Sequence, residues 1–205
     1  RDDSGARFDG DFQALENWSM DADFFDQLEA WGLDASTFKA TTFDTVDLIH
    51  PDDVITQAYT DGAAYRIVER GTSEHTIDQG FKRQAIEAGA HLHYKSRMKE
   101  EDCTIIACGP KGTSAVAYGE IFHTDHPNHI AFQLNDKLAP GSYSYLIIID
   151  GVGLICTCLW RKQRKSDRFL NETIAWYETH YPNLNRQPIK RVGGKGDFTI
   201  NRRYK

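Results

Sequence analysis

Four strand-type segments follow one another between residues 115 and 160, and this succession constrains the fold more than any other feature. The segments are 115–124, 129–134, 142–149 and 152–160. The pair Asp150-Gly151 separates the last two, and such a pair favours a two-residue hairpin turn. Strands grouped together with few helices are typical of a mostly antiparallel sheet in an α+β domain. We therefore predict an α+β fold with a mostly antiparallel sheet.

Three segments have helical periodicity. The first is 21–31, in which Phe24, Phe25, Leu28 and Trp31 share one face. The second begins at Ser73 or Glu74 and ends at Ala88, with a stripe of Ile77, Phe81, Ala85 and Ala88 and with Gly89 as its C-cap. The third is 166–179, with Ser166 as the cap and Phe169, Leu170, Thr173, Ile174 and Tyr177 on its buried face.

The first half of the chain contains shorter strand signals. They lie at 42–49, 54–59, 64–69, 91–95 and 104–108. Asp61-Gly62 predicts a hairpin between the second and third of them, and residues 1–20 are interpreted as a loop. A helix followed by a glycine and then an apolar strand is the order of elements typical of an α/β layer. We predict an α/β region at 1–112 and an antiparallel region at 113–205, or one compact domain made of both. A final strand is expected at 197–200.

The composition excludes several classes of protein. The 205 residues are 40% hydrophobic and 26% charged, as in a globular protein, and the net charge of -6 predicts no nucleic-acid partner. The basic run 161–165 is interpreted as a solvated loop. No segment resembles a signal peptide or a membrane span. Cys103, Cys108, Cys156 and Cys158 form no C-x-x-C pair and lie in apolar segments, so we expect buried reduced thiols and a cytoplasmic location.

The segment at 104–111, TIIACGPK, carries the most specific resemblance to a known family. It is similar to the "DIIATGP(R/K)" element of FAD-dependent oxidoreductases of the geranylgeranyl reductase and p-hydroxybenzoate hydroxylase-like family, with Cys108 where the family usually has threonine. Glycine and proline after a buried strand let the backbone approach a ligand closely. The resemblance implies that Cys108, Gly109, Pro110 and Lys111 approach the cofactor. An ordinary strand-to-turn exit is the alternative.

Other segments resemble the same family more loosely. GARF at 5–8 is similar to the loop after the second strand of its FAD-binding unit, which implies that Arg7 lies near the pyrophosphate. The helix before Gly89 resembles the one that contributes a basic or amide side chain to the flavin, and Arg83 and Gln84 are the candidates. APGSYSY at 139–145 resembles a segment of the substrate cavity, so Tyr143, Tyr145 and also Trp160 are predicted substrate contacts. The pair at 193–194 resembles a glycine pair that shapes the cavity floor. Each of these side chains has a structural alternative, as a surface arginine or a rim aromatic.

Two defining parts of the family are absent from the sequence. It contains no G-x-G-x-x-G between a strand and a helix, and no C-terminal G-D stretch. The chain also starts at Arg1 without a methionine, and we expect that both ends are cuts through a longer fold. The resemblance implies FAD as the cofactor of the intact parent, with NAD(P)H or another electron donor, and reduction or hydroxylation of a large apolar, isoprenoid-like substrate. The alternatives are a non-catalytic binding module and one half of a split flavoprotein, whose partner chain brings the missing motifs. A peripheral membrane contact would suit a lipid substrate.

The histidines allow a second hypothesis, a metal site. His123, His126 and His129 form H-x-D-H-x-x-H with Asp125, but the spacing crosses a proline and matches no standard zinc pattern. We therefore expect no bound metal. The sequence has no G-x-S-x-G or comparable local signature, and no catalytic residue is predicted.

Overall fold

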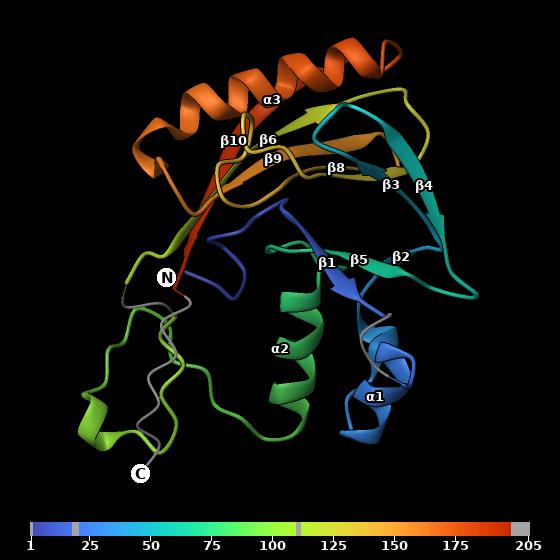
Figure 1. Cartoon of the computed structure of the whole chain (residues 1–205). Helices are drawn as coiled ribbons and strands as arrows, with labels where there is room; N and C mark the ends of the chain where they lie inside the picture. Colours follow the sequence, from blue (N-terminus) through green and yellow to red (C-terminus); the bar gives the residue numbers. More distant parts are fainter. Residues whose placement is uncertain (1, 18–20, 110–111, 198–205) are drawn as a thin grey trace. The chain divides into compact units, whose positions relative to one another are not determined.

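The computed structural model describes residues 2–17, 21–109 and 112–197. Its backbone divides into two compact units. Unit 1 comprises residues 1–45 and 59–107, and unit 2 comprises residues 46–58 and 108–205. The predicted 1–112 region thus holds all of unit 1 together with residues 46–58 and 108–112, which belong to unit 2. The fold is a mixture of helices and mostly antiparallel strands, as the sequence predicted (Figure 1).

Unit 1 contains a three-stranded antiparallel sheet in the order β1-β5-β2. Its elements are β1 (Phe12–Glu16), α1 (Phe24–Ala30), the 3-10 turn η1 (Ala35–Thr37), β2 (Ala40–Phe43), β5 (Tyr65–Glu69), α2 (Ile77–Glu87) and the 3-10 turn η2 (Glu100–Asp102). Val68 of β5 and Phe38 are buried in its core, and Phe81 of α2 packs against them. The rings of Phe38 and Phe81 meet edge to face with centroids 5.5 Å apart, an arrangement that aromatic pairs prefer.

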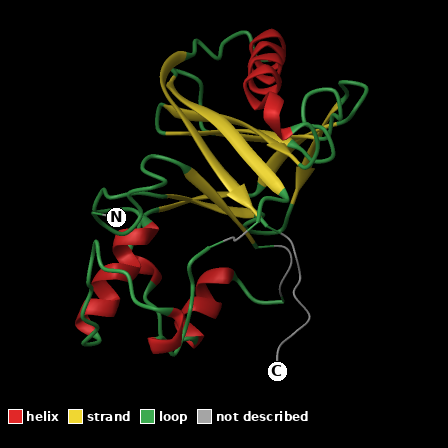
Figure 2. Ribbon diagram, turned by 90° about the vertical axis from the view of Figure 1, so that its left-hand side faces the viewer, coloured by secondary structure: helices red, strands yellow, loops and turns green. Residues whose placement is uncertain are grey.

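Unit 2 is built on a seven-stranded sheet in the order β10-β6-β9-β8-β7-β3-β4. The strands are β3 (Thr45–Ile49), β4 (Ile55–Tyr59), β6 (Ala115–His123), β7 (His129–Gln133), β8 (Ser144–Ile149), β9 (Val152–Leu159) and β10 (Gln187–Gly196). The 3-10 turn η3 (Gln163–Lys165) leads into α3 (Ser166–His180), which lies across one face of the sheet (Figures 1 and 2). β3 and β7 run parallel to each other. The pairs β7–β8, β8–β9 and β6–β9 are antiparallel.

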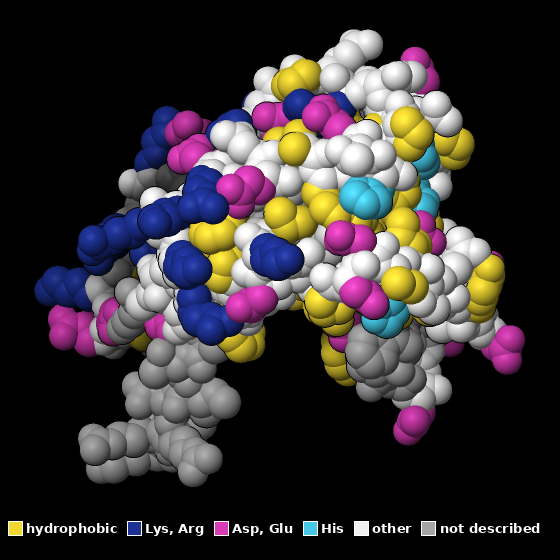
Figure 3. Space-filling view, turned by 45° about the horizontal axis from the view of Figure 1, so that its top comes forward, with side chains coloured by type: hydrophobic (Ala, Val, Ile, Leu, Met, Phe, Trp, Pro, Cys, Tyr) yellow, Lys and Arg dark blue, Asp and Glu magenta, His cyan; other side chains and the backbone are white. Residues whose placement is uncertain are grey.

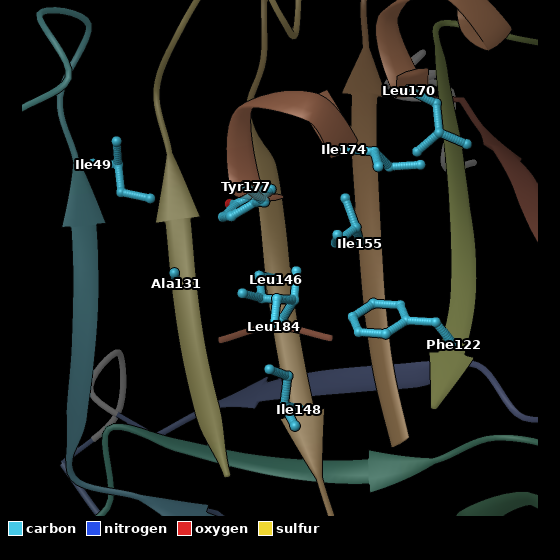
Figure 4. Close-up of a cluster of buried hydrophobic side chains, with 10 residues drawn as sticks. All are labelled: Ile49, Phe122, Ala131, Leu146, Ile148, Ile155, Leu170, Ile174, Tyr177 and Leu184. Carbon is cyan, nitrogen blue, oxygen red and sulfur yellow. The ribbon is translucent and has the colours of Figure 1, made fainter. Parts of the chain in front are cut away.

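The core of unit 2 lies between this face and α3. Leu146, Ile155 and Leu170 are fully buried there, together with Tyr177 (Figure 4). Phe122 shows how tightly the strands meet. A Cβ on its cross-strand neighbour Gly153 would stand 2.2 Å from the Phe122 ring, so only glycine fits beneath that ring. Phe169, Thr173 and Ile174 are also buried, and the predicted inner face of this helix is therefore confirmed.

The hairpin at Asp150-Gly151 is also confirmed. β8 and β9 pair with Ile149 opposite Val152, and both turn residues have positive φ, 50° and 82°. This is the left-handed pair that a type I′ turn requires and that Asp-Gly tolerates.

Several predicted boundaries were wrong. Asp61-Gly62 does not close a hairpin, because β4 belongs to the sheet of unit 2 and β5 to that of unit 1. The predicted strand 42–49 is two strands, β2 and β3, divided between the same two sheets. β1 forms within the predicted 1–20 loop. Ser166 is not a cap, because η3 runs directly into α3 and Ser166 already has helical φ and ψ of -53° and -42°.

The predicted strands at 91–95 and 104–108 are absent from the described structure, in which both segments are loops. Ile105 is 84% exposed, and Leu92, Met98 and Ile106 are exposed as well. Figure 3 shows hydrophobic side chains at the surface among charged ones. Apolar sequence alone did not make a strand here, because among the described residues no neighbouring strand pairs with these segments. Consistently, the cysteine prediction holds only in part, since Cys156 is buried and Cys108 is exposed.

The last strand in the described part of the chain, β10, lies at 187–196, and the strand predicted at 197–200 falls almost wholly outside that part. Residues 198–200 are outside the described part of the chain. Pro188 is accommodated at a bulge on the sheet edge, one of the few places in a sheet where proline is tolerated. Gly193 is also required, because a Cβ there would stand 2.9 Å from the Tyr118 ring. The predicted glycine pair is therefore part of β10.

Candidate functional site

Tyr143, Tyr145 and Phe132 form an aromatic patch on the sheet of unit 2. Their ring centroids are 6.1 to 6.2 Å apart in all three pairs. Tyr145 stands directly opposite Phe132 in the β7–β8 ladder. The neighbours Leu146 and Ala131 belong to the core under α3, and side chains alternate between faces along a strand. The aromatic patch therefore lies on the sheet face that α3 does not cover.

The loop between β7 and β8 positions Tyr143. Ser142 N donates to Ala139 O at 2.9 Å, and Gly141, with φ of 83°, makes the turn before the strand. Asp136 accepts a hydrogen bond from Gly141 N at 2.7 Å and two from Arg161 Nη2 at 2.7 and 2.8 Å. The backbone contact with Gly141, followed by the charge of Arg161, lowers the pKa of Asp136. The loop is thus held at its turn and at the end of β9.

Trp160 is placed at the same end of the sheet. Trp160 N donates to Pro140 O at 3.3 Å, while Cys158 N donates to Tyr143 O at 2.9 Å. The indole is 56% exposed and Tyr143 is 40% exposed, whereas Tyr145 and Phe132 are half-buried. The structure therefore brings the three predicted substrate residues to one region of unit 2. Such an aromatic, partly exposed surface can contact an apolar ligand by shape and by exclusion of water.

Phe132 is the member of the patch that the sequence analysis did not select. The signal was available in the alternation of the segment HIAFQ at 129–133, because Ile130 and Phe132 share a strand face. What the alternation could not show was that this face would meet Tyr145, since the register of β7 on β8 depends on the loop between them.

In unit 1, the predicted cofactor residues Arg83 and Gln84 are hydrogen-bonded to other parts of the same unit. Arg83 donates to Glu74 O at 2.8 Å and also to Thr37 O. Gln84 bonds the backbone of Asp34 through both ends of its amide, at 2.8 and 3.0 Å, and donates to Thr37 Oγ1 at 2.7 Å. Both side chains thus fix η1 to α2. Their role at a flavin stays a prediction. To bind a flavin, the two side chains would have to give up these hydrogen bonds.

Arg7, Cys108 and Gly109 are more accessible. The Arg7 side chain is exposed, and its guanidinium lies 5.4 Å from the centre of the Phe8 ring. Cys108 and Gly109 are exposed. Gly109 has φ of 78°, and a Cβ at this position would meet no heavy atom within 4 Å, so the space beside it is open. Pro110 and Lys111 lie outside the described residues.

A cluster of titratable groups lies at another place in unit 2. Asp47 of β3 is buried and accepts hydrogen bonds from Tyr181 Oη at 3.1 Å and Gln57 Nε2 at 3.3 Å. His129 Nε2 lies 3.1 Å from the same carboxylate but is not aligned for a hydrogen bond. The His126 ring is 5.5 Å from that of His129. Burial lowers the pKa of His129 despite the attraction of Asp47, and burial and then Asp47 raise the pKa of Tyr181. The lowered pKa of His129 favours a neutral imidazole at this position.

The H-x-D-H-x-x-H pattern therefore resolves into separate contacts. His126 and His129 pack near Tyr181. Within residues 2–17, 21–109 and 112–197, no group of three or more His, Cys, Asp or Glu side chains is arranged to hold a metal ion. No helix in the same part of the chain is long and apolar enough to cross a membrane.

Comparison with known proteins gives a likeness among solved structures. No family model and no curated protein sequence matches the chain. Among solved structures, the chain is similar to a geranylgeranyl bacteriochlorophyll reductase-like protein from Thermoplasma acidophilum, with a TM-score of 0.57 and 13% sequence identity. The likeness covers 95% of this chain and 57% of that protein, so the chain spans little more than half of its length. At this identity the likeness shows that the two share a fold.

Proposed function

We propose that this chain is part of an FAD-dependent oxidoreductase that acts on a large apolar, isoprenoid-like substrate. The observation that carries the proposal is the shared fold with a geranylgeranyl bacteriochlorophyll reductase-like protein over 95% of the chain. The aromatic patch supports the substrate class. The ring centroids of Phe132, Tyr143 and Tyr145 lie within 6.2 Å of one another on the side of the sheet away from α3, and such an apolar surface suits a prenyl chain.

The described residues provide only part of a flavin site. Arg7 is exposed and could pair with a phosphate, and the open space beside Gly109 suits a close backbone approach. Arg83 and Gln84 are engaged in hydrogen bonds with the backbone of Thr37 and Asp34, respectively. The sequence has no G-x-G-x-x-G helix start to bind the pyrophosphate. These residues do not amount to a complete FAD site, and reduction and hydroxylation remain alternative reactions of the intact protein.

The missing part of the site would come from further polypeptide, in the same protein or in a partner chain. The chain spans 57% of the structurally similar protein. In unit 1, the loops from 91 to 108 expose Leu92, Met98, Ile105 and Ile106. Strand-type sequence with exposed apolar side chains is a surface on which an additional strand can pair. We infer that added polypeptide covers this surface and completes the cofactor site.

A non-catalytic binding module is the second candidate. It is favoured by the finding that unit 2 has a core of its own, in which Leu146, Ile155, Leu170 and Tyr177 are fully buried. A unit with such a core could keep an apolar binding surface without any cofactor.

Titration of the purified chain with FAD, followed by flavin fluorescence quenching, tests the oxidoreductase proposal. We expect weak but saturable binding, because part of the contact surface is present. Arg7→Ala should weaken it further, whereas Arg97→Ala, which removes another exposed arginine of unit 1, should not. No saturable binding by a chain with native circular dichroism would contradict the assignment of these cofactor residues and favour the binding module.

A further inference from the structure

Four buried polar atoms in the described part of the chain have no hydrogen-bond partner, and all of them belong to unit 2. They are His129 Nε2, Gln133 Nε2, Thr173 Oγ1 and Tyr177 Oη. His129 and Gln133 share the face of β7 that carries Ala131 toward α3, and Thr173 and Tyr177 lie on the buried face of α3. The atoms without partners therefore lie along the interface between one sheet face and one helix.

The sheet contributes a row of polar residues to this interface. Gln133, Ser144 and Thr157 are opposite one another on β7, β8 and β9, and each has 0% exposure. Thr157 Oγ1 donates to Leu138 O at 3.0 Å, and Ser144 Oγ donates to Gln133 Oε1 at 3.0 Å. The Gln133 amide thus has its acceptor satisfied, while its two N–H donors remain without an acceptor.

The helix contributes two buried hydroxyls, those of Thr173 and Tyr177. Thr173 and Tyr177 are four residues apart, so they are neighbours on one side of α3. Figure 4 shows Tyr177 over the part of the sheet that carries Ala131 and Leu146. Burial raises the pKa of Tyr177 well above its usual value, and the Ser144 hydroxyl is close enough to oppose that shift. The phenol therefore lies beside Ser144, whose hydroxyl donates to Gln133 Oε1, and its own hydroxyl can both donate and accept.

We propose that Gln133 and Tyr177 bind a buried water molecule, with Thr173 as a further partner. Buried polar groups in proteins are satisfied by protein atoms or by ordered water, and a group left without either bears its full desolvation cost. A water molecule can both accept and donate the hydrogen bonds that these side chains lack. It accepts from Gln133 Nε2 and can donate to Tyr177 Oη and Thr173 Oγ1, which gives the two to four bonds usual for internal water. This site does not depend on the proposed oxidoreductase activity.

A crystal structure of the full chain at a resolution that shows ordered water is the direct test. We expect a density peak within hydrogen-bonding distance of both Gln133 Nε2 and Tyr177 Oη. A direct contact between these two atoms, with no peak between them, would overturn the proposal.

Removing the hydroxyl of Tyr177 gives an independent measurement in solution. If the hydroxyl bonds water, Tyr177→Phe loses that bond, and the equilibrium constant for unfolding should rise about tenfold, the scale of one typical net hydrogen bond. Tyr181→Phe provides the reference, because its hydroxyl has a direct partner in Asp47 at 3.1 Å. An unfolding constant for Tyr177→Phe equal to or below that of the unaltered chain would show an unbonded hydroxyl and would contradict the water site. Thr173→Val, measured in the same way, tests the third partner.

Discussion

The loop segment 104–108 and strand β8 have similar sequences but different structures. Both contain consecutive isoleucines, yet Ile147 and Ile148 are 1% and 0% exposed, whereas Ile105 is 84% exposed. β8 is hydrogen-bonded to β7 on one side and to β9 on the other. Among the described residues, 104–108 pairs with no strand. An apolar, β-branched sequence therefore becomes a strand only where a neighbouring strand completes its backbone hydrogen bonds.

Amide hydrogen exchange should show the largest difference between the two regions. The β8 amides should exchange only through global unfolding, whereas those of 104–108 should exchange almost as in an unfolded chain. For an ordinary domain stability this is a difference of about 10³-fold or more. Equal protection of both regions would indicate that 104–108 is paired after all.

Two matched isoleucine variants should separate the regions by stability. Ile155→Ala removes a fully buried side chain from the core under α3, and we expect a loss of about 2–5 kcal/mol in the free energy of unfolding. Ile105→Ala shortens an exposed side chain and should change stability by no more than about 0.5 kcal/mol. Urea denaturation measures both. A loss of similar size for Ile105→Ala would mean that its side chain is buried.

An ion-pair network ties the edge strand of unit 2 to its neighbours. Glu120 of β6 is buried and pairs with Arg186, and it lies 3.5 Å from Arg191 Nε. Glu120→Ala would leave both guanidinium groups without this partner, at a cost of about 2–3 kcal/mol, since Arg191 is partly solvated. Glu172→Ala, which breaks the exposed pair with Arg168, should cost about 0.3–0.5 kcal/mol. Thermal unfolding of the two variants compares them, and equal losses would show that the network does not stabilise unit 2.

The pH dependence of stability should give a smaller effect. Burial, opposed by Asp47, lowers the pKa of His129 in the folded chain. The unfolded chain then binds more protons than the folded one as the pH falls through the usual histidine value of about 6.5. His129 should therefore reduce stability at acid pH, and the reduction should disappear as the pH rises. His129→Gln should flatten this part of the profile between pH 8 and 5, and an unchanged slope would contradict the assignment.

Local sequence signals predicted much of unit 2. The turn at Asp150-Gly151 depends on two residues, and the inner face of α3 depends on helical spacing, so both could be derived without tertiary contacts. β10 was missed because Pro188 and three glycines, including Gly193, oppose a strand assignment, while the edge position and the Tyr118 ring that make them fit are tertiary features.

The candidate site was harder to predict because it depends on distant partners. Tyr143 and Tyr145 could be selected from one segment, but Phe132 joins them only through the register of β7 on β8. The contact between His129 and Asp47 joins residues far apart in the sequence. Arg83 was selected as a cofactor residue, but its guanidinium donates to Glu74 O and Thr37 O within unit 1. These hydrogen bonds could not be predicted from the sequence.

We propose that the aromatic patch of unit 2 binds a large apolar molecule, and a titration that measures ligand binding to the chain tests this directly. Isothermal titration of the chain with a prenyl alcohol, such as geranylgeraniol below its aggregation limit, should show saturable binding. Tyr145→Ser should weaken that binding several-fold, whereas Tyr59→Ser, at a tyrosine 71% exposed on β4, should leave it unchanged. Absence of saturable binding by the folded chain, or equal binding by both variants, would contradict the claim.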